Sequence, residues 1–471
     1  MEYNIAMTES TNRLLNDFLL KDTSDEEICF AIWHPAEGKS RYSVLIRDII
    51  FPEDKERIRD GTVSALPEYV DRVKELAREK GGGLAMIHTH PGGVNWQNVS
   101  SPDLYYEQDV LSREVFGITG YPFVGMTLAG NGTWSGRIYP IPFKIKWCSA
   151  IRIVGKNLTI HFNPKIKFPP RTSKKQIRTL TVWGKEKQAD IARMKVGIIG
   201  VGSVGSMVGE TLARLGVGEI FIMDYDKVKI HNLDRMNCLS EDDVGRKKID
   251  VVQKNLTKAA TANKFLCTKS ESSVVEPDGY KEALDCDVIF SCVDRPWPRQ
   301  VLNNLAYSCL IPVVDGGISF KVLNETLIHG MYRAQTVGPE RACMSCLKAF
   351  DAGEVQRDRD GLFDDPKYIE KLESESGPTR QSIMPFVVAL AGLEAIQFVE
   401  LVTNMGKMGD LGQQPYNYYP GDIIPILKDC VLGCEYVGKI AFGDSQKPYL
   451  ATDKSRAREL KPKKRKWRER R

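Results

Sequence analysis

The sequence lacks the features that carry a chain into or across a membrane. Its first 20 residues are mostly polar, with no basic segment ahead of a long apolar core, so they do not form the pattern of a secretion signal. The best candidate for a membrane span, residues 386–402, contains Glu394 and Glu400, which favours a buried helix of a globular protein. We therefore expect a cytoplasmic protein that does not contact a membrane.

Cysteine is sparse, with 11 residues scattered through a chain of 471. Without a secretion signal, this number favours reduced thiols or metal ligands over a framework of disulfides. The formal net charge of +5 comes from the end of the sequence, where residues 454–471 carry +9 and leave about −4 for the rest. We interpret residues 446–471 as a solvated, mobile basic tail. A nucleic-acid or partner-binding arm is the alternative, although nothing else indicates a nucleic-acid partner.

A chain of 471 residues is too long for one hydrophobic core and should divide into two or three domains. Residues 1–150 combine strand-like runs with one helical pattern, Leu66–Glu79, which a glycine run terminates, so they predict a compact α/β domain. The strand-like runs are Ile28–Trp33, Tyr42–Ile50, Leu84–Thr89 and Pro122–Ala129. Residues 151–175 end in prolines and lysines without periodicity, which predicts a linker.

Residues 176–445 predict a second α/β domain, because apolar strands alternate with helical patterns. The elements are strand 195–200, helix Ser203–Leu215, strand Glu219–Asp224, helix Gly245–Leu256, and the strands Val288–Val293 and Ile311–Asp315. This order is typical of a mostly parallel, doubly wound, Rossmann-like sheet. The charged segment 351–380 has few large apolar side chains, so we expect an exposed loop there.

Two histidines one residue apart, His88 and His90, end an apolar run in the first domain. On a strand they point to the same face, so one metal ion can take both imidazoles. Asp103 follows 13 residues later and completes three protein ligands, leaving a fourth position for water, as a catalytic zinc requires. Glu27, at the start of an earlier strand, is the candidate proton acceptor. The simpler alternative is a histidine pair that binds no metal.

The first domain resembles the JAMM (JAB/MPN) metalloproteases, which cleave bonds after the C-terminus of ubiquitin-like proteins. The resemblance covers roughly residues 1–145 and is carried by "EIC" at 27–29, "HTHP" at 88–91 and "SSPD" at 100–103. It implies a catalytic zinc ion, a general base and a side chain that stabilises the oxyanion. The residues implied are His88, His90 and Asp103 for zinc, Glu27 for the base, and Ser100 for the oxyanion.

This sequence departs from the metalloprotease pattern in one loop. Nine residues separate His90 from Ser100, more than the family usually has, and the longer loop reshapes substrate access or displaces Ser100. Glu26 is a nearby rival for Glu27. A metal-free relative that only docks partners is the alternative interpretation of the whole domain.

A glycine-rich signature, G-x-G-x-x-G at Gly200, Gly202 and Gly205, opens the second domain. It begins a helix whose N-terminal amides favour an anionic phosphate. Asp224, at the end of the next strand, suits a ribose hydroxyl. Dinucleotide dehydrogenases carry the same pattern, so these residues alone predict a nucleotide site without identifying the nucleotide.

The segments that follow resemble ubiquitin-activating and ThiF/MoeB-type adenylyltransferases. They are "DYDKVKIHNLDR" at 224–235, "VGRKK" at 244–248 and "IFSCVDR" at 289–295. The resemblance implies an ATP site in which Asp224 binds the ribose, other residues bind phosphates, and one carboxylate holds Mg²⁺. The implied phosphate residues are Asn232, Arg235 and Lys248, and the implied magnesium ligand is Asp294. Arg178 matches an arginine that reaches a partner's ATP, so a homodimer is expected.

Four cysteines form two short motifs, Cys343 with Cys346 and Cys430 with Cys434, which together predict a structural zinc site. The alternative is four unconnected buried thiols. Residues 347–385 contain no cysteine, although related activating enzymes that form a thioester carry theirs in this region. Three alternatives stay open: direct attack on the adenylate by an external nucleophile, catalysis by another thiol such as Cys238, or catalysis by Cys430 or Cys434.

Together the two resemblances imply a bifunctional enzyme. The first domain would cleave after the C-terminal glycine of a ubiquitin-like carrier, and the second would adenylate the carboxylate, with a conjugating enzyme as a further partner. Such fusions resemble components of prokaryotic ubiquitin-like conjugation systems, several of which are associated with defence against phage. Activation of a sulfur-carrier protein for thiocarboxylate formation is a second hypothesis. An inactive carrier-binding scaffold is a third.

Overall fold

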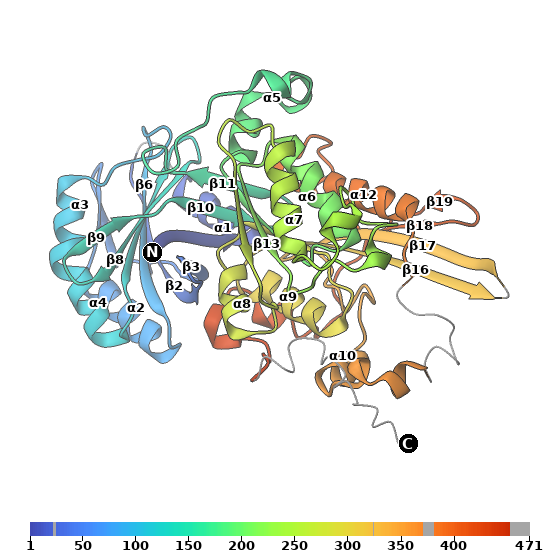
Figure 1. Cartoon of the computed structure of the whole chain (residues 1–471). Coiled ribbons are helices and arrows are strands. Elements are labelled where there is room, and N and C mark those ends of the chain that lie inside the picture. Colours follow the sequence, from blue (N-terminus) through green and yellow to red (C-terminus); the bar gives the residue numbers. More distant parts are fainter. Residues whose placement is uncertain (22–24, 324, 371–380, 453–471) are drawn as a thin grey trace.

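The computed structural model describes residues 1–471 except 22–24, 324, 371–380 and 453–471 (Figure 1). Two mixed sheets with flanking helices organise these residues. The N-terminal sheet has nine strands in the order β11-β10-β1-β3-β2-β6-β7-β8-β9, and the second has eight in the order β14-β13-β12-β15-β16-β17-β18-β19. Most of the predicted basic tail, from residue 453 onward, lies outside the described residues.

The N-terminal sheet is buried on both faces, as its central strand β2 (Ile28–Glu37) shows. Even-numbered residues from Ile28 to Ile32 share a core with helix α2 (Pro67–Glu79), and odd-numbered residues from Cys29 to Trp33 share one with α1 (Glu9–Leu19). The other strands are β1 (Glu2–Thr8), β3 (Arg41–Ile50), β6 (Gly83–His90), β7 (Phe123–Ala129), β8 (Trp134–Ile141) and β9 (Lys144–Trp147). Further elements are α3 (Ser101–Tyr105), a π-helical turn (Tyr106–Leu111), α4 (Ser112–Thr119), and the hairpin β4 (Arg57–Arg59) and β5 (Val63–Ala65).

Residues 151–175 are predicted to be a linker, and this prediction is wrong for the first half of the segment, which forms two strands. Strand β10 (Ala150–Val154) pairs in parallel with β1, and β11 (Leu158–Phe162) pairs with β10, so both extend the N-terminal sheet. The chain returns to the sheet because β1 leaves an edge that a short apolar strand can complete. Residues 163–173 contain neither helix nor strand.

The second sheet is doubly wound. Strand β12 (Lys195–Ile199) pairs in parallel with β13 (Glu219–Met223) on one side and with β15 (Val288–Ser291) on the other. The remaining strands are β14 (Leu266–Ser270), β16 (Val313–Leu323), β17 (Thr326–Val337), β18 (Gln414–Asn417) and β19 (Asp422–Ile423). From β12 the strand order proceeds to β13 and β14 on one side of the sheet, and from β15 it proceeds to β16 on the other side. This reversal of strand order opens a crevice at the carboxyl ends of β12 and β15.

Helices cover this sheet much as the sequence predicts. The helix predicted at Ser203–Leu215 is α6, with the same bounds. The other helices are α5 (Ile177–Ile191), α7 (Lys248–Ala259), α8 (Pro277–Ala283), α9 (Pro296–Ser308), α10 (Ala352–Arg359) and α12 (Met384–Thr403). In the described residues α12 alone is long and apolar enough to cross a membrane, and 78% of its most apolar window is buried inside the protein. The loop expected at 351–380 contains α10, whose Asp358 binds Arg295 at 2.9 Å.

One hydrophobic core joins the two sheets, which lie side by side in Figure 1. Leu45 of β3 belongs to the same buried cluster as Ile198 of β12. At this junction the Arg41 guanidinium donates to Asp287 Oδ1 at 2.8 Å, and both side chains are almost fully buried. Arg41 is held by its partner because an unpaired buried charge is costly. These contacts fix the two units against each other.

Candidate functional sites

A cavity of about 750 Å³ lies at the carboxyl ends of β12, β13 and β15. Its floor is the glycine turn between β12 and α6. Gly200 has φ +88°, and a Cβ on Gly205 would lie 2.0 Å from the Gly200 carbonyl oxygen, so Gly205 allows α6 to approach the turn. No side chain caps α6 at Gly202, which leaves the first amides of the helix for an anionic ligand.

Asp224 is fixed at the end of β13. Its Oδ2 accepts from the Val201 amide at 2.9 Å and its Oδ1 from the Asp226 amide at 2.7 Å. Burial raises the pKa of Asp224, and nearby Lys248 counteracts this effect. The carboxyl group is thus oriented toward the cavity edge by backbone amides, with lone pairs left for a ligand hydroxyl.

Lys248 enters the cavity from the first turn of α7. Its ammonium group donates to Asp226 Oδ2 at 2.7 Å. Burial lowers the pKa of Lys248, but Asp224 and Asp226 outweigh it, and the net pKa is raised. The side chain is therefore a cation at neutral pH, in position to meet a phosphate.

The cavity brings together most of the residues predicted for the nucleotide site. Those lining it are Gly200, Gly202, Asp224, Asn232, Arg235, Lys248 and Asp294. Gly205 lies behind the turn, and Arg178 is exposed on α5. The structure thus groups the predicted ribose, phosphate and magnesium residues in one cavity. Arg178 does not line the cavity of its own chain.

The cavity lining also includes two arginines, Arg299 and Arg333, that the sequence did not single out. Arg299 Nε and Arg333 donate to opposite oxygens of buried Asp315, at 2.8 and 2.9 Å. Burial raises the pKa of Asp315, but the two arginines outweigh it and hold the pKa below its usual value. The residues come from α9, β16 and β17, so only the tertiary fold brings them together. The sole signal in the sequence was Asp315 at the end of a predicted strand.

The three predicted metal ligands of the N-terminal unit also converge. His88 Nε2 lies 3.3 Å from His90 Nε2 and 3.5 Å from Asp103 Oδ2, and the three ligand atoms all lie within 4.8 Å of one another. Burial, followed by the charge of Arg137, lowers the pKa of His88 to about 3. A neutral imidazole is the form that binds a metal, so these residues fit a zinc ion.

Ser100 stays beside Asp103 despite the longer loop. Its Oγ donates to Asp103 Oδ2 at 2.5 Å and also caps α3. The loop is tied down in the middle, because Trp96 packs on the core and the Gln97 amide donates to Ser135 Oγ at 2.6 Å. The added length therefore lies at the loop surface, where Val94 is exposed.

The structure places Glu27 in an ion pair. Its Oε1 lies 2.6 Å from Arg57 Nε, and its Oε2 accepts from the second guanidinium nitrogen of Arg57 at 3.0 Å. The neighbouring Glu26 is half-buried and interacts electrostatically with His90 and Asp103. The two candidates for the base thus have different surroundings.

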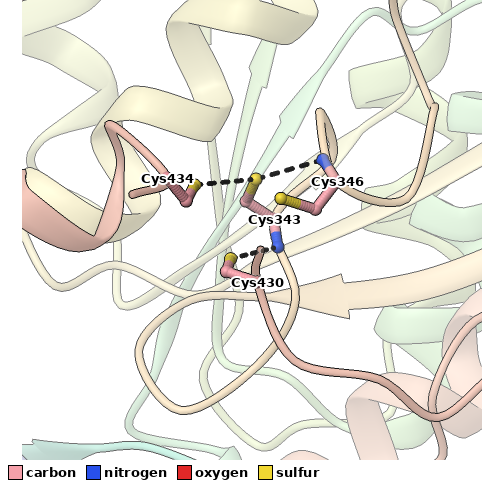
Figure 2. A group of neighbouring side chains, drawn as sticks. All are labelled: Cys343, Cys346, Cys430 and Cys434. Carbon is pink, nitrogen blue, oxygen red and sulfur yellow. Dashed lines mark hydrogen bonds between the residues drawn. The ribbon is translucent and has the colours of Figure 1, made fainter. Parts of the chain in front are cut away.

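Figure 2 shows the four predicted cysteine ligands turned toward one another. Cys343 Sγ lies 3.7 Å from Cys434 Sγ, and Cys430 Sγ accepts from the Cys343 amide at 3.2 Å. All four sulfur atoms lie within 4.8 Å of one another, and none forms a disulfide. This arrangement fits a structural zinc ion bound by four thiolates.

The remaining thiols offer no evident nucleophile. Cys238 is exposed, and burial together with Glu210, 3.6 Å away, raises its pKa. Cys292 lines the nucleotide cavity, but burial raises the pKa of its thiol well above the usual value. Both thiols are therefore protonated at neutral pH, the unreactive form.

A doubly wound sheet with a glycine turn and grouped cations at its crevice defines a nucleotide-binding protein. The model of the ThiF family matches residues 173–419, more than half of the 471-residue chain. The chain therefore belongs to the ThiF family. The matched range contains the whole nucleotide cavity and leaves the His–Asp cluster outside it.

Known proteins resemble parts of this chain. It is 25% identical over 232 residues to ubiquitin-like modifier-activating enzyme 5 of Aedes aegypti, covering 47% of this chain and 53% of that protein. It is 29% identical over 168 residues to the protein of that name from Culex quinquefasciatus, covering 33% and 40%. The chain thus spans about half the length of the curated relatives it matches, or less. Escherichia coli MccB with MccA-N7isoASN superposes with a TM-score of 0.46 at 18% identity, over 57% of this chain and 76% of that one, a similarity too loose to carry further argument.

Proposed function

We propose that the chain is an ATP-dependent adenylyltransferase that activates the C-terminal carboxylate of a small ubiquitin-like or sulfur-carrier protein ending in glycine. The cavity is the main support, because it groups Arg235, Lys248 and Asp294 with the glycine turn. A nicotinamide site has no need of these cations. Attack of a carboxylate on the α-phosphate of ATP builds negative charge that such cations offset. Membership of the ThiF family supports the same chemistry.

Each cavity residue then has a role that follows from its position. Asp224 would bind the ribose, because backbone amides already orient its carboxyl group. Asn232, Arg235 and Lys248 would bind the phosphates, together with the free amides at the start of α6. Asp294 would hold Mg²⁺, which neutralises phosphate charge when bound.

We also propose that the N-terminal unit is a zinc peptidase that cleaves after the carrier's C-terminal glycine. The convergence of His88, His90 and Asp103 supports it, and these residues would hold the ion. When bound, zinc would bring a water molecule toward hydroxide at neutral pH. A carboxylate at the start of β2 would accept a proton from water, and Ser100 would stabilise the oxyanion. The peptidase would mature the carrier or remove it from targets, and the adenylyltransferase would begin its attachment.

The state of the thiols is compatible with both the conjugation and the sulfur-carrier versions of this function. Cys430 and Cys434 lie in the four-cysteine cluster, and Cys238 and Cys292 are held protonated. Without a ready thiol, the adenylate would pass directly to an external nucleophile, either a sulfur donor or a conjugating enzyme. An inactive carrier-binding scaffold is the remaining alternative.

Further proposals concern assembly. A homodimer is proposed, in which exposed Arg178 reaches the ATP of the partner, since Arg178 lies outside the cavity of its own chain. The four cysteines would hold a structural zinc ion. The protein would act in the cytoplasm.

Adenylation is tested by the release of pyrophosphate from Mg-ATP in the presence of small glycine-ended β-grasp carriers. Lys248→Ala should slow the reaction by about 100-fold or more, because one stabilising charge at the reacting phosphate is lost. Lys247→Ala is the matched control, since Lys247 instead pairs with Glu271 on the surface. Equal activity of both variants would contradict the assignment of the cavity.

Cleavage is tested with a carrier that is extended beyond its terminal glycine. His90→Ala should abolish cleavage and leave pyrophosphate release intact, and Asp294→Ala should do the reverse. The control is His329→Ala, which changes an exposed histidine of β17. Loss of both activities in a folded His90 or Asp294 variant would contradict the two-site proposal.

A further inference from the structure

Two adjacent carboxylates, Glu26 and Glu27, precede β2, and strand pairing decides which of them faces the metal ligands. Strand β2 runs antiparallel to β6, with Ile28 opposite His88. The pairing continues one residue further, because the Thr89 amide donates to the Glu27 carbonyl at 3.0 Å. Residues directly opposite each other in a sheet project from the same face. Glu27 therefore shares a face with Thr89, and the alternation of side chains along an extended chain assigns Glu26 to the face of His88 and His90.

The surroundings of Glu27 agree with this placement. Its carboxylate is bound by Arg57, and Arg59 lies 3.8 Å away. The amide of Ile28 also donates to Glu27 Oε1, at 3.0 Å. The side chain is only 8% exposed, and both of its oxygens are in use. To accept a proton, Glu27 would first have to give up its ion pair with Arg57, which includes the charge-assisted hydrogen bond to Oε2.

The surroundings of Glu26 suit the opposite role. Burial and the nearby Asp103 raise the pKa of Glu26, whereas His90 and the backbone of Val63 in β5 lower it, so the carboxylate is near both ligands. It is half-buried, so one side remains open. The guanidinium of Arg59 contacts this residue through the backbone, where Nε donates to the Glu26 carbonyl oxygen at 3.3 Å.

We propose that Glu26 is the proton acceptor of the N-terminal site, and that Glu27 with Arg57 is a strut that holds the hairpin β4–β5 against β2. This rests on the proposed peptidase function. Glu26 takes one proton from water as the hydroxide oxygen bonds to the scissile carbonyl carbon, whose π electrons move onto the carbonyl oxygen. Glu26 then gives that proton to the leaving nitrogen as the C–N bond breaks. The new carboxylic acid transfers its own proton to the amine, and Glu26 is again ionised.

The Glu27–Arg57 pair affects Glu26 through the hairpin β4–β5. Arg57 from β4 binds Glu27, and Val63 from β5 binds Glu26, so the hairpin contacts both carboxylates. The Glu27–Arg57 ion pair anchors the hairpin on the face that carries Thr89. The backbone contact with Val63 positions the Glu26 carboxylate on the face of the metal ligands. Glu27 thus acts through its neighbour and is a positioning residue.

The experiment compares Glu26→Gln with Glu27→Gln in the full chain, since each change removes charge and keeps shape. The probe for turnover is a fluorogenic aminocoumarin amide of a Gly-Gly peptide. A second readout is the affinity for Zn²⁺ alone, measured by competition with a chromophoric chelator. Pyrophosphate release by the second unit, which shares a core with the first, reports whether each variant is folded.

We expect Glu26→Gln to lower turnover by about 100-fold or more and to weaken Zn²⁺ binding about tenfold, because a carboxylate beside the ligands is lost. Glu27→Gln should keep turnover within about tenfold, and Zn²⁺ affinity within about twofold, of the values of the unaltered protein. It should increase hydrogen exchange of the backbone amides in the hairpin β4–β5. The reverse pattern, with Glu27→Gln affecting both readouts and Glu26→Gln neither, would overturn the proposal. If the unaltered protein binds Zn²⁺ but does not cleave the probe, the peptidase proposal fails, and the Zn²⁺ affinities still decide which carboxylate faces the ligands.

Discussion

Alanine substitutions at Gly205 and Gly202, two glycines of the nucleotide turn, should have different effects. The first should lower the melting temperature, and the second should weaken ATP binding without lowering it. A Cβ on Gly205 would lie 2.0 Å from the Gly200 carbonyl oxygen, more than 1 Å inside the roughly 3.4 Å of an ordinary contact. Gly205→Ala must therefore push α6 away from β12. Overpacking of this kind costs about 1–3 kcal/mol, or about 2–12 °C in melting temperature for a unit of this size.

Gly202 is the control for this effect. A Cβ on Gly202 meets no atom within 4 Å and points into open space at the cavity. Gly202→Ala should leave the melting temperature within about 1 °C, since nothing is displaced, and should weaken ATP binding by obstructing the phosphates. Differential scanning calorimetry and isothermal titration with Mg-ATP measure the two quantities. A Gly205→Ala protein with unchanged melting temperature and ATP affinity would show that α6 does not need this close approach to the turn.

Three further predictions concern stability. Arg41→Ala should lower the free energy of unfolding by about 3–5 kcal/mol in urea, because Asp287 is left charged and buried. Asp287 and Asp315 both have pKa values lowered by arginines that outweigh burial, so their stabilisation is present above the unfolded pKa of about 3.9 and is lost as the pH falls below it. Cys346→Ser should lower the melting temperature and abolish sensitivity to chelators at the cysteine cluster, whereas Cys238→Ser should do neither.

Each of these predictions has a contradicting outcome. An Arg41→Ala protein as stable as the original would mean that the junction between the sheets contributes little. Melting temperatures that stay level from pH 5 to pH 3 would contradict the role of the two aspartates. A Cys346→Ser protein that still binds a second Zn²⁺ ion would show that the four thiols do not act together.

The sequence predicts the elements with strong local patterns. Helix α6 has the predicted bounds because its apolar period of 3.6 follows directly on the glycine turn. Helix α12 is mostly buried, and its two glutamates had indicated this. By contrast, β10 and β11 were assigned to a linker, since strands of five residues carry little period and form here by completing the edge at β1.

The sites were foreseeable where spacing alone brings residues together. His88 and His90 lie two residues apart on a strand, and the two cysteine motifs provide paired ligands. The face on which Glu26 or Glu27 lies was not foreseeable, because it depends on the register with β6 and not on local pattern. The pair of arginines on Asp315 comes from a helix and a distant strand, so no spacing in the sequence reports it.

Adenylation of a protein carboxylate is the activity that we propose for this chain. The most direct measurement is the intact mass of a glycine-ended carrier after incubation with the protein and Mg-ATP, read together with the mass of the protein. We expect a carrier heavier by one AMP, or AMP release when a nucleophile removes the adenylate, with no thiol-sensitive adduct on the protein. If glycine-ended ubiquitin-like and sulfur-carrier proteins all stay unchanged, and neither AMP nor pyrophosphate forms, the proposed adenylation is contradicted.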